Sequence, residues 1–69
     1  MSSLTKFESM LKTQKILFFD LDEFEDIIIQ YLDMGKHGLA KQAIKLGLEQ
    51  HPTSTDLKFF KIQMHVFDN

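Results

Sequence analysis

Cysteine is absent from this chain of 69 residues, and so is any long apolar run. Without cysteine the fold has no disulfides, and a reducing, intracellular setting is the default expectation. The run Ile16–Phe19 falls far short of the roughly 20 apolar residues that span a membrane. Residues 1–6 lack the apolar stretch of a secretory signal. We therefore expect a soluble, cytoplasmic protein without a membrane partner.

A surplus of positive charge is also missing, since the formal net charge is −2. This disfavours nucleic acid as a partner, because nucleic-acid binders usually carry a basic footprint. The charge is unevenly spread: residues 1–19 carry +2, residues 20–33 carry −6 and residues 34–50 carry +2. In one interpretation, the acidic residues lie at the N-terminal end of a helix because the helix dipole is positive there. In the other, these residues form an acidic patch that selects a basic partner.

Side chains that carry enzyme chemistry are few and unfavourably spaced. His37, His51 and His65 are fourteen residues apart, which is not the spacing of a local metal site. The carboxylates of residues 22–26 would need a cleft to separate their pKa values before they could act as acid and base. No glycine-rich phosphate loop or nucleophile motif occurs. The sequence therefore predicts a non-catalytic protein with no metal site and no cofactor.

Apolar spacing predicts four helical segments. The first covers about 5–14 with a capping box of Thr5 and Glu8, the second follows residue 20, the third covers about 38–50, and the fourth begins near Thr55. Ile16–Phe19 is too short to assign by period, and fits either a buried connector or an extended, strand-like piece. Pro52 stops the third helix, and residues 53–56 offer caps for the fourth.

The second helix has the best-defined start. With Asp20 as N-cap, Glu23 at N3 completes an acidic variant of the capping box. Phe19 and Phe24 stand at the N′ and N4 positions of a hydrophobic staple. Gly35 reads as the C-terminal stop, because glycine adopts the left-handed conformation without penalty.

Small residues on one face of the third helix predict a close helix contact. Ala40, Ala43 and Gly47 share that face with larger apolar residues. Glycine in mid-helix costs about 1 kcal/mol relative to alanine, so Gly47 is better explained by packing than by helix propensity. A bulky residue at Ala40 or Gly47 should therefore separate the helices.

Residues of defined size recur between positions 24 and 52 at the spacing of a helical-hairpin repeat. They are Phe24, Ile27, Tyr31, Gly35, Ala40, Ile44, Gly47 and Pro52. The pattern resembles the tetratricopeptide repeat (TPR), a helix-turn-helix unit of roughly 34 residues. Ile28, where the family has glycine or another small residue, and Ile44, where it has an aromatic, depart from that signature.

The resemblance implies an all-α fold of antiparallel helical hairpins of the TPR-like alpha-solenoid type, with about four helices. It divides the chain into an N-terminal helix with an apolar connector (1–19), a TPR-like hairpin (20–54) and the first helix of a second, truncated repeat (55–69). It also implies that the chain is the N-terminal part of a longer TPR protein.

By the same resemblance, the function is that of a non-catalytic protein-protein interaction scaffold that binds a peptide or helix of a partner protein. The implied binding face consists of Asp22, Glu25, Ile29, Leu32, Asp33, Asp56, Phe59, Gln63, Val66 and Phe67. It mixes carboxylates with apolar groups, which favours a partner with basic and apolar residues.

Two alternatives remain open. The apolar fourth helix could be the interface of a small homo-oligomeric helical protein, whose stability would depend on concentration. Three short helices also fit a helix-turn-helix DNA binder. The acidic second helix disfavours the latter, as does a third helix whose lysines are only Lys41 and Lys45.

Overall fold

The computed structural model describes residues 2–67 of the chain, and the side chains of residues 2–65. This part of the chain is all-helical, with four helices and no strand. The helices are α1 (Ser3–Thr13), α2 (Leu21–Asp33), α3 (His37–Gln50) and α4 (Thr55–Phe67). Each of the four predicted helical segments is therefore present.

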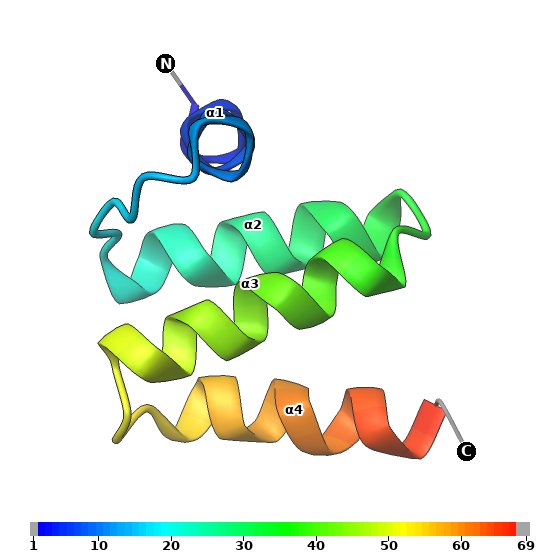
Figure 1. Cartoon of the computed structure of the whole chain (residues 1–69). Coiled ribbons are helices and arrows are strands. Elements are labelled where there is room, and N and C mark those ends of the chain that lie inside the picture. The colour runs from blue at the N-terminus through cyan, green and yellow to red at the C-terminus, as the bar shows by residue number, and fades with distance from the viewer. Residues whose placement is uncertain (1, 68–69) are drawn as a thin grey trace.

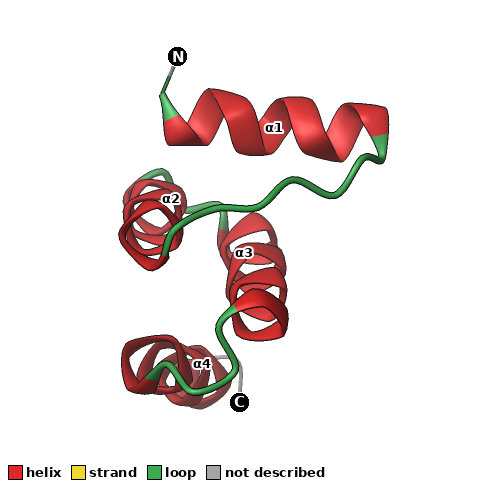
Figure 2. Cartoon of the chain, turned by 90° about the vertical axis from the view of Figure 1, so that its left-hand side faces the viewer, coloured by secondary structure: helices red, strands yellow, loops and turns green. Residues whose placement is uncertain are grey.

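Three of the helices lie side by side, and the first crosses them. Figure 1 shows α2, α3 and α4 running across the view as a stack joined by short turns, while α1 is seen end-on. In Figure 2 the stack is seen nearly end-on, with α2 and α4 on one side and α3 on the other. Helix α3 packs against both α2 and α4, and α1 packs mainly on α2. One flank of the molecule is thus shared by α2 and α4.

The core draws on all four helices and on the connector between α1 and α2. Its buried residues are Phe7, Met10, Phe19, Phe24, Ile27, Ile28, Tyr31, Ala40, Ala43, Ile44, Leu57 and Met64. Phe19 and Tyr31 both meet the Phe7 ring, with centroids 5.9 and 6.1 Å away. This cluster of rings fixes the crossing helix α1 against the stack.

Helix α1 begins earlier than the sequence predicts. Its N-cap is Ser2, whose Oγ accepts a hydrogen bond from the Thr5 backbone N–H at 3.2 Å. The predicted capping box of Thr5 and Glu8 is therefore wrong, because the serine one turn upstream already satisfies that amide. Glu8 instead accepts a hydrogen bond from the Tyr31 hydroxyl at 3.1 Å.

The predicted ends of α2 are confirmed. The capping box joins Asp20 and Glu23, with the Asp20 N–H donating to the Glu23 carboxylate at 3.0 Å. The staple brings the rings of Phe19 and Phe24 to 5.4 Å. At the other end Gly35 has φ +71°, and the amides of Gly35 and Lys36 bond to the last turn of α2 as in a Schellman motif.

Residues 16–19 form an extended connector without strand pairing. Leu17 and Phe19 turn inward, whereas Ile16 and Phe18 are 82% and 63% exposed, which is the alternation of an extended chain. The side-chain amide of Gln50 donates to the Leu17 carbonyl at 2.8 Å and accepts from the Phe19 N–H at 3.0 Å. A side chain from α3 thus supplies the hydrogen bonds that a neighbouring strand would give.

The small face of α3 allows the predicted close contact. Ala40 and Ala43 are fully buried. A Cβ added at Gly47 would lie 2.9 Å from Leu57 Cδ1 and 3.2 Å from Phe24 Cγ. Gly47 therefore marks a point where α2 and α4 both come into close contact with α3.

The turn before α4 is capped as the sequence suggests. Helix α3 ends at Gln50, two residues before Pro52. Ser54 Oγ then accepts a hydrogen bond from the Leu57 N–H at 3.2 Å, which caps the first turn of α4. Leu57 and Met64 of α4 are buried in the core, and α4 packs on α3.

Candidate functional site

The residues predicted to bind a partner come from α2 and α4, the two helices on one flank of the stack (Figure 2). We use the name "α2–α4 face" for Asp22, Glu25, Ile29, Leu32 and Asp33 of α2 with Asp56, Phe59 and Gln63 of α4. Val66 and Phe67 belong to α4, but their side chains lie outside the described residues.

Carboxylates gather at one end of this face. A side-chain hydrogen bond with Asp56, together with burial and the negative charges of Asp56 and Asp22, raises the pKa of Glu25. The packing of α2 and α4 on α3 therefore brings together Glu25 and Asp56, which are 31 positions apart in the sequence. Because like charges at close range destabilise each other, this end of the face attracts cations.

Apolar side chains occupy the middle of the face. Ile29 is 48% exposed on α2 and Phe59 is 58% exposed on α4. Both residues sit on well-formed helices whose opposite sides are packed in the core. Their exposure follows from their position on the helix, and it leaves two large apolar groups available for contact.

A hollow of about 230 Å³ lies at the other end of α2. It is lined by Leu32 of α2, by His37 of α3, and by Phe60, Gln63 and Met64 of α4. Leu32 and Gln63, both predicted for the site, are brought together here. Asp33, at the end of α2, is exposed and does not line the hollow.

His37 and Phe60 were not among the predicted site residues. Phe60 has the helical spacing of the buried Leu57 and Met64, which favours a buried position, but it is partly exposed. His37 follows the turn at Gly35 and is the first residue of α3. Its position two residues after the glycine at the end of α2 is the sequence signal that places it near that end.

The residues of the repeat signature lie where helices touch or turn. Phe24, Ile27, Tyr31, Ala40, Ile44 and Gly47 are buried, while Gly35 and Pro52 stand at the two turns. Burial, followed by the hydrogen bond to the Glu8 carboxylate and its charge, raises the pKa of Tyr31 to about 12. These residues act in packing and contribute little to the exposed face.

The histidines are dispersed over the fold. His37 and His65 are exposed on α3 and α4. His51 Nε2 donates to the Phe19 carbonyl at 2.8 Å, and its ring meets Phe24 edge-on. Within residues 2–65, no group of three or more His, Cys, Asp and Glu side chains is arranged to hold a metal ion.

Comparison with protein-family models, with curated proteins and with solved structures finds no match for the chain. None of the helices in the described range is long and apolar enough to cross a bilayer.

Proposed function

We propose that this chain is a non-catalytic, TPR-like interaction module. The support comes from the places that the signature residues occupy. At Gly47, Phe24 of α2 and Leu57 of α4 both lie close to the backbone of α3. The helices α2, α3 and α4 stack with short turns, so α2 and α4 would be the equivalent first helices of two consecutive hairpins (Figure 1).

In this proposal the α2–α4 face binds a partner segment that carries basic and apolar residues. The observation that carries it is the juxtaposition of Glu25 and Asp56 beside exposed Ile29 and Phe59. Two carboxylates across a helix interface repel each other in the free protein. A lysine or arginine placed between them would relieve that repulsion, while apolar neighbours would bury Ile29 and Phe59.

The test uses two synthetic peptides of equal length, one alternating lysine with leucine and the other alternating glutamate with leucine. Binding to the full 69-residue chain is followed by amide chemical shifts at low and at high salt. The lysine peptide should shift amides of α2 and α4, and its affinity should fall as salt rises. Equal shifts of the Glu25 and Ile29 amides by both peptides would refute the proposal.

A matched pair of variants locates the site. Glu25→Lys should weaken binding of the lysine peptide at least tenfold, and Glu25→Lys with Asp33→Lys should abolish it. Glu49→Lys makes the same charge change as the single variant on α3, away from the α2–α4 face, and should leave affinity within about twofold. An equal loss in Glu25→Lys and Glu49→Lys would show that only net charge matters.

Self-association is the second candidate, favoured by the exposure of Phe59 and Ile62, 58% and 62%, on α4. Both side chains would be covered if two copies paired through this helix. Light scattering across a wide concentration range tests it. A mass that stays that of one chain at every concentration excludes this candidate.

A further inference from the structure

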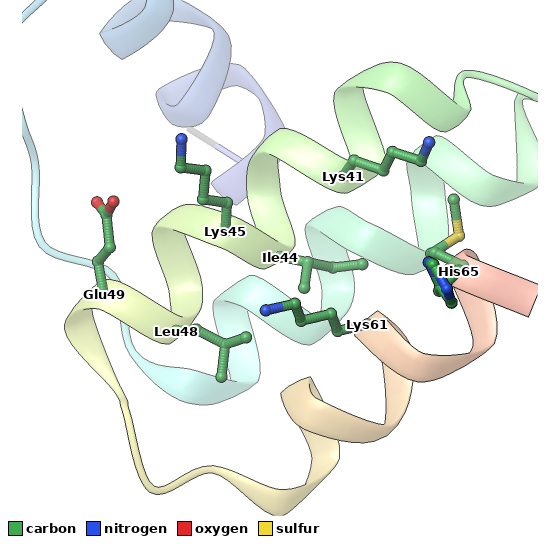
Figure 3. A pocket seen from close by; sticks show the side chains of 8 residues that line it. Lys41, Ile44, Lys45, Leu48, Glu49, Lys61 and His65 are labelled. Carbon is green, nitrogen blue, oxygen red and sulfur yellow. The ribbon is translucent and has the colours of Figure 1, made fainter. Parts of the chain in front are cut away.

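A second hollow of the molecule lies on another surface, between α3 and α4 (Figure 3). Its volume is about 510 Å³. We call it the α3–α4 groove. It is lined by Lys41, Ile44, Lys45, Leu48 and Glu49 of α3 and by Lys61, Met64 and His65 of α4. Apart from Ile44, Leu48 and Met64, which pack in or against the core, its residues have no part in the α2–α4 face or in the core.

The groove has an apolar floor. Ile44 and Leu48 stand one helical turn apart on α3, and Met64 of α4 completes the floor. Leu48 remains partly exposed. Side chains spaced i and i+4 along a helix form a ridge beside a groove, and such a groove accepts the apolar ridge of another helix.

Basic groups border this floor on both sides. Lys41 and Lys45 are one turn apart on α3, and Lys61 and His65 are one turn apart on α4. In Figure 3 Lys61 extends from α4 toward Leu48, and Lys45 extends from α3 on the side away from α4. Glu49 is the acidic residue among the lining side chains. The charge at the rim is therefore predominantly positive.

We propose that the α3–α4 groove binds an amphipathic helix of a partner protein, with an apolar stripe flanked by Asp and Glu. The apolar stripe would cover Ile44, Leu48 and Met64, and the acidic flanks would meet Lys45 and Lys61. A nucleic-acid backbone fits less well, because phosphates would leave the apolar floor uncovered. This binding does not depend on the α2–α4 face.

The probe is a synthetic helix-forming peptide of about 14 residues. Leucines at i, i+3, i+4 and i+7 form its apolar stripe, and glutamates flank the stripe. One control peptide has lysine in place of every glutamate, and a second has glutamine in place of every leucine. Binding to the full chain is measured by fluorescence anisotropy at 20 and 200 mM salt, with amide shifts to locate the contact.

The acidic leucine peptide should bind, shift the amides of Lys45, Leu48 and Lys61, and weaken several-fold at the higher salt. Both control peptides should bind at least tenfold more weakly. Comparable binding of the lysine peptide would overturn the charge argument. Comparable binding of the glutamine peptide would overturn the role of the apolar floor.

A charge-matched pair of variants completes the test. Lys45→Glu with Lys61→Glu should reduce affinity for the acidic leucine peptide at least tenfold. Lys12→Glu with Lys58→Glu makes the same net change at exposed lysines outside the groove, and should stay within twofold. Circular dichroism checks that both variants keep the helical content of the parent.

Three further outcomes would overturn the proposal. They are equal losses in the two variants, peptide-induced shifts confined to the α2–α4 face, and displacement of the bound peptide by a short DNA duplex at lower concentration than by unlabelled peptide. Failure here leaves the lysine-peptide experiment on the α2–α4 face unaffected, because the two probes carry opposite charge and contact different residues.

Discussion

Two glycines of α3 allow the packing of the stack to be tested by one chemical change made twice. Gly38 lies in the first turn with no atom within 4 Å of an added Cβ. Gly47 is buried, and an added Cβ there would meet Leu57 and the Phe24 ring at 2.9–3.3 Å. Gly→Ala removes the same conformational freedom from the unfolded chain at both sites, which is worth about 0.4–1 kcal/mol.

The two variants should differ because the neighbours of Gly47 cannot retreat. Leu57 is itself fully buried. The Phe24 ring is confined between Phe19 and His51, with ring centroids at 5.4 and 5.8 Å. Overpacking a core by one methyl group costs about 1–3 kcal/mol. Gly38→Ala should therefore stabilise the protein by up to about 1 kcal/mol, and Gly47→Ala should be about 1–3 kcal/mol less stable than Gly38→Ala.

Urea unfolding followed by circular dichroism measures this difference. At this chain length 1 kcal/mol corresponds to a change in Tm of about 4–8 °C, so thermal melts give a second reading. Because both variants lose the same glycine entropy, their difference isolates the contact with Phe24 and Leu57. A Gly47→Ala protein as stable as Gly38→Ala would refute the close approach of the three helices.

Three more predictions follow from single side chains. Gln50→Glu should lower stability by about 1–3 kcal/mol in urea unfolding, since the carboxylate cannot donate to the Leu17 carbonyl. Tyr31→Phe should be about 1 kcal/mol less stable than the parent at pH 8. Because the pKa of Tyr31 is raised, its contribution to stability is fully present below pH 10 and is lost as the pH rises through about 12. The difference in stability between parent and variant should therefore shrink over that range. Glu25→Gln should raise stability by about 0.5 kcal/mol at pH 7, because it removes a like-charge repulsion with Asp56 that solvent partly screens. Because the pKa of Glu25 is raised, its favourable contribution to stability is present below pH 4.5 and is lost as the pH rises above that value. The gain from Glu25→Gln should therefore vanish in acid.

Each of these has a clear counter-result. Gln63→Glu, the same change at an exposed glutamine, should cost little stability. Equal losses of stability in Gln50→Glu and Gln63→Glu would refute the role of Gln50 in holding the connector. A parent-minus-variant difference for Tyr31→Phe that stays constant from pH 8 to pH 12 would contradict its raised pKa. A Glu25→Gln gain that persists at pH 4 would show that charge repulsion is not its origin.

The helix positions were predictable because their signals are local. Asp20 and Glu23 cap α2, Gly35 stops it, and Pro52 follows the end of α3, all within a few residues of the boundary they set. The start of α1 was predicted wrongly because Ser2 and Thr5 can both cap a helix, and the sequence alone does not rank them.

Features that depend on tertiary packing were harder to predict. Lys41 and Lys45, taken with α3 alone, read as an ordinary solvated helix face. Only the packing of α4 beside α3 places them across a groove from Lys61. The pairing of Glu25 with Asp56 likewise depends on α2 and α4 lying on the same side of α3 (Figure 2). The crossing of α1 over the stack has no signal in its own residues (Figure 1).

The hydrogen bonds from Gln50 and His51 to the connector fasten residues 17–19 to the far end of α3, 31 to 33 positions along the chain. The α2–α3 hairpin is thereby closed at both ends, by its turn and by this clasp. A force pulling on the N-terminus would act first on α1, whose Phe7 and Met10 belong to the core, and would next meet this clasp before it reached the α2–α3 hairpin. In a single-molecule pulling experiment, the release of α1 should therefore precede the opening of the hairpin.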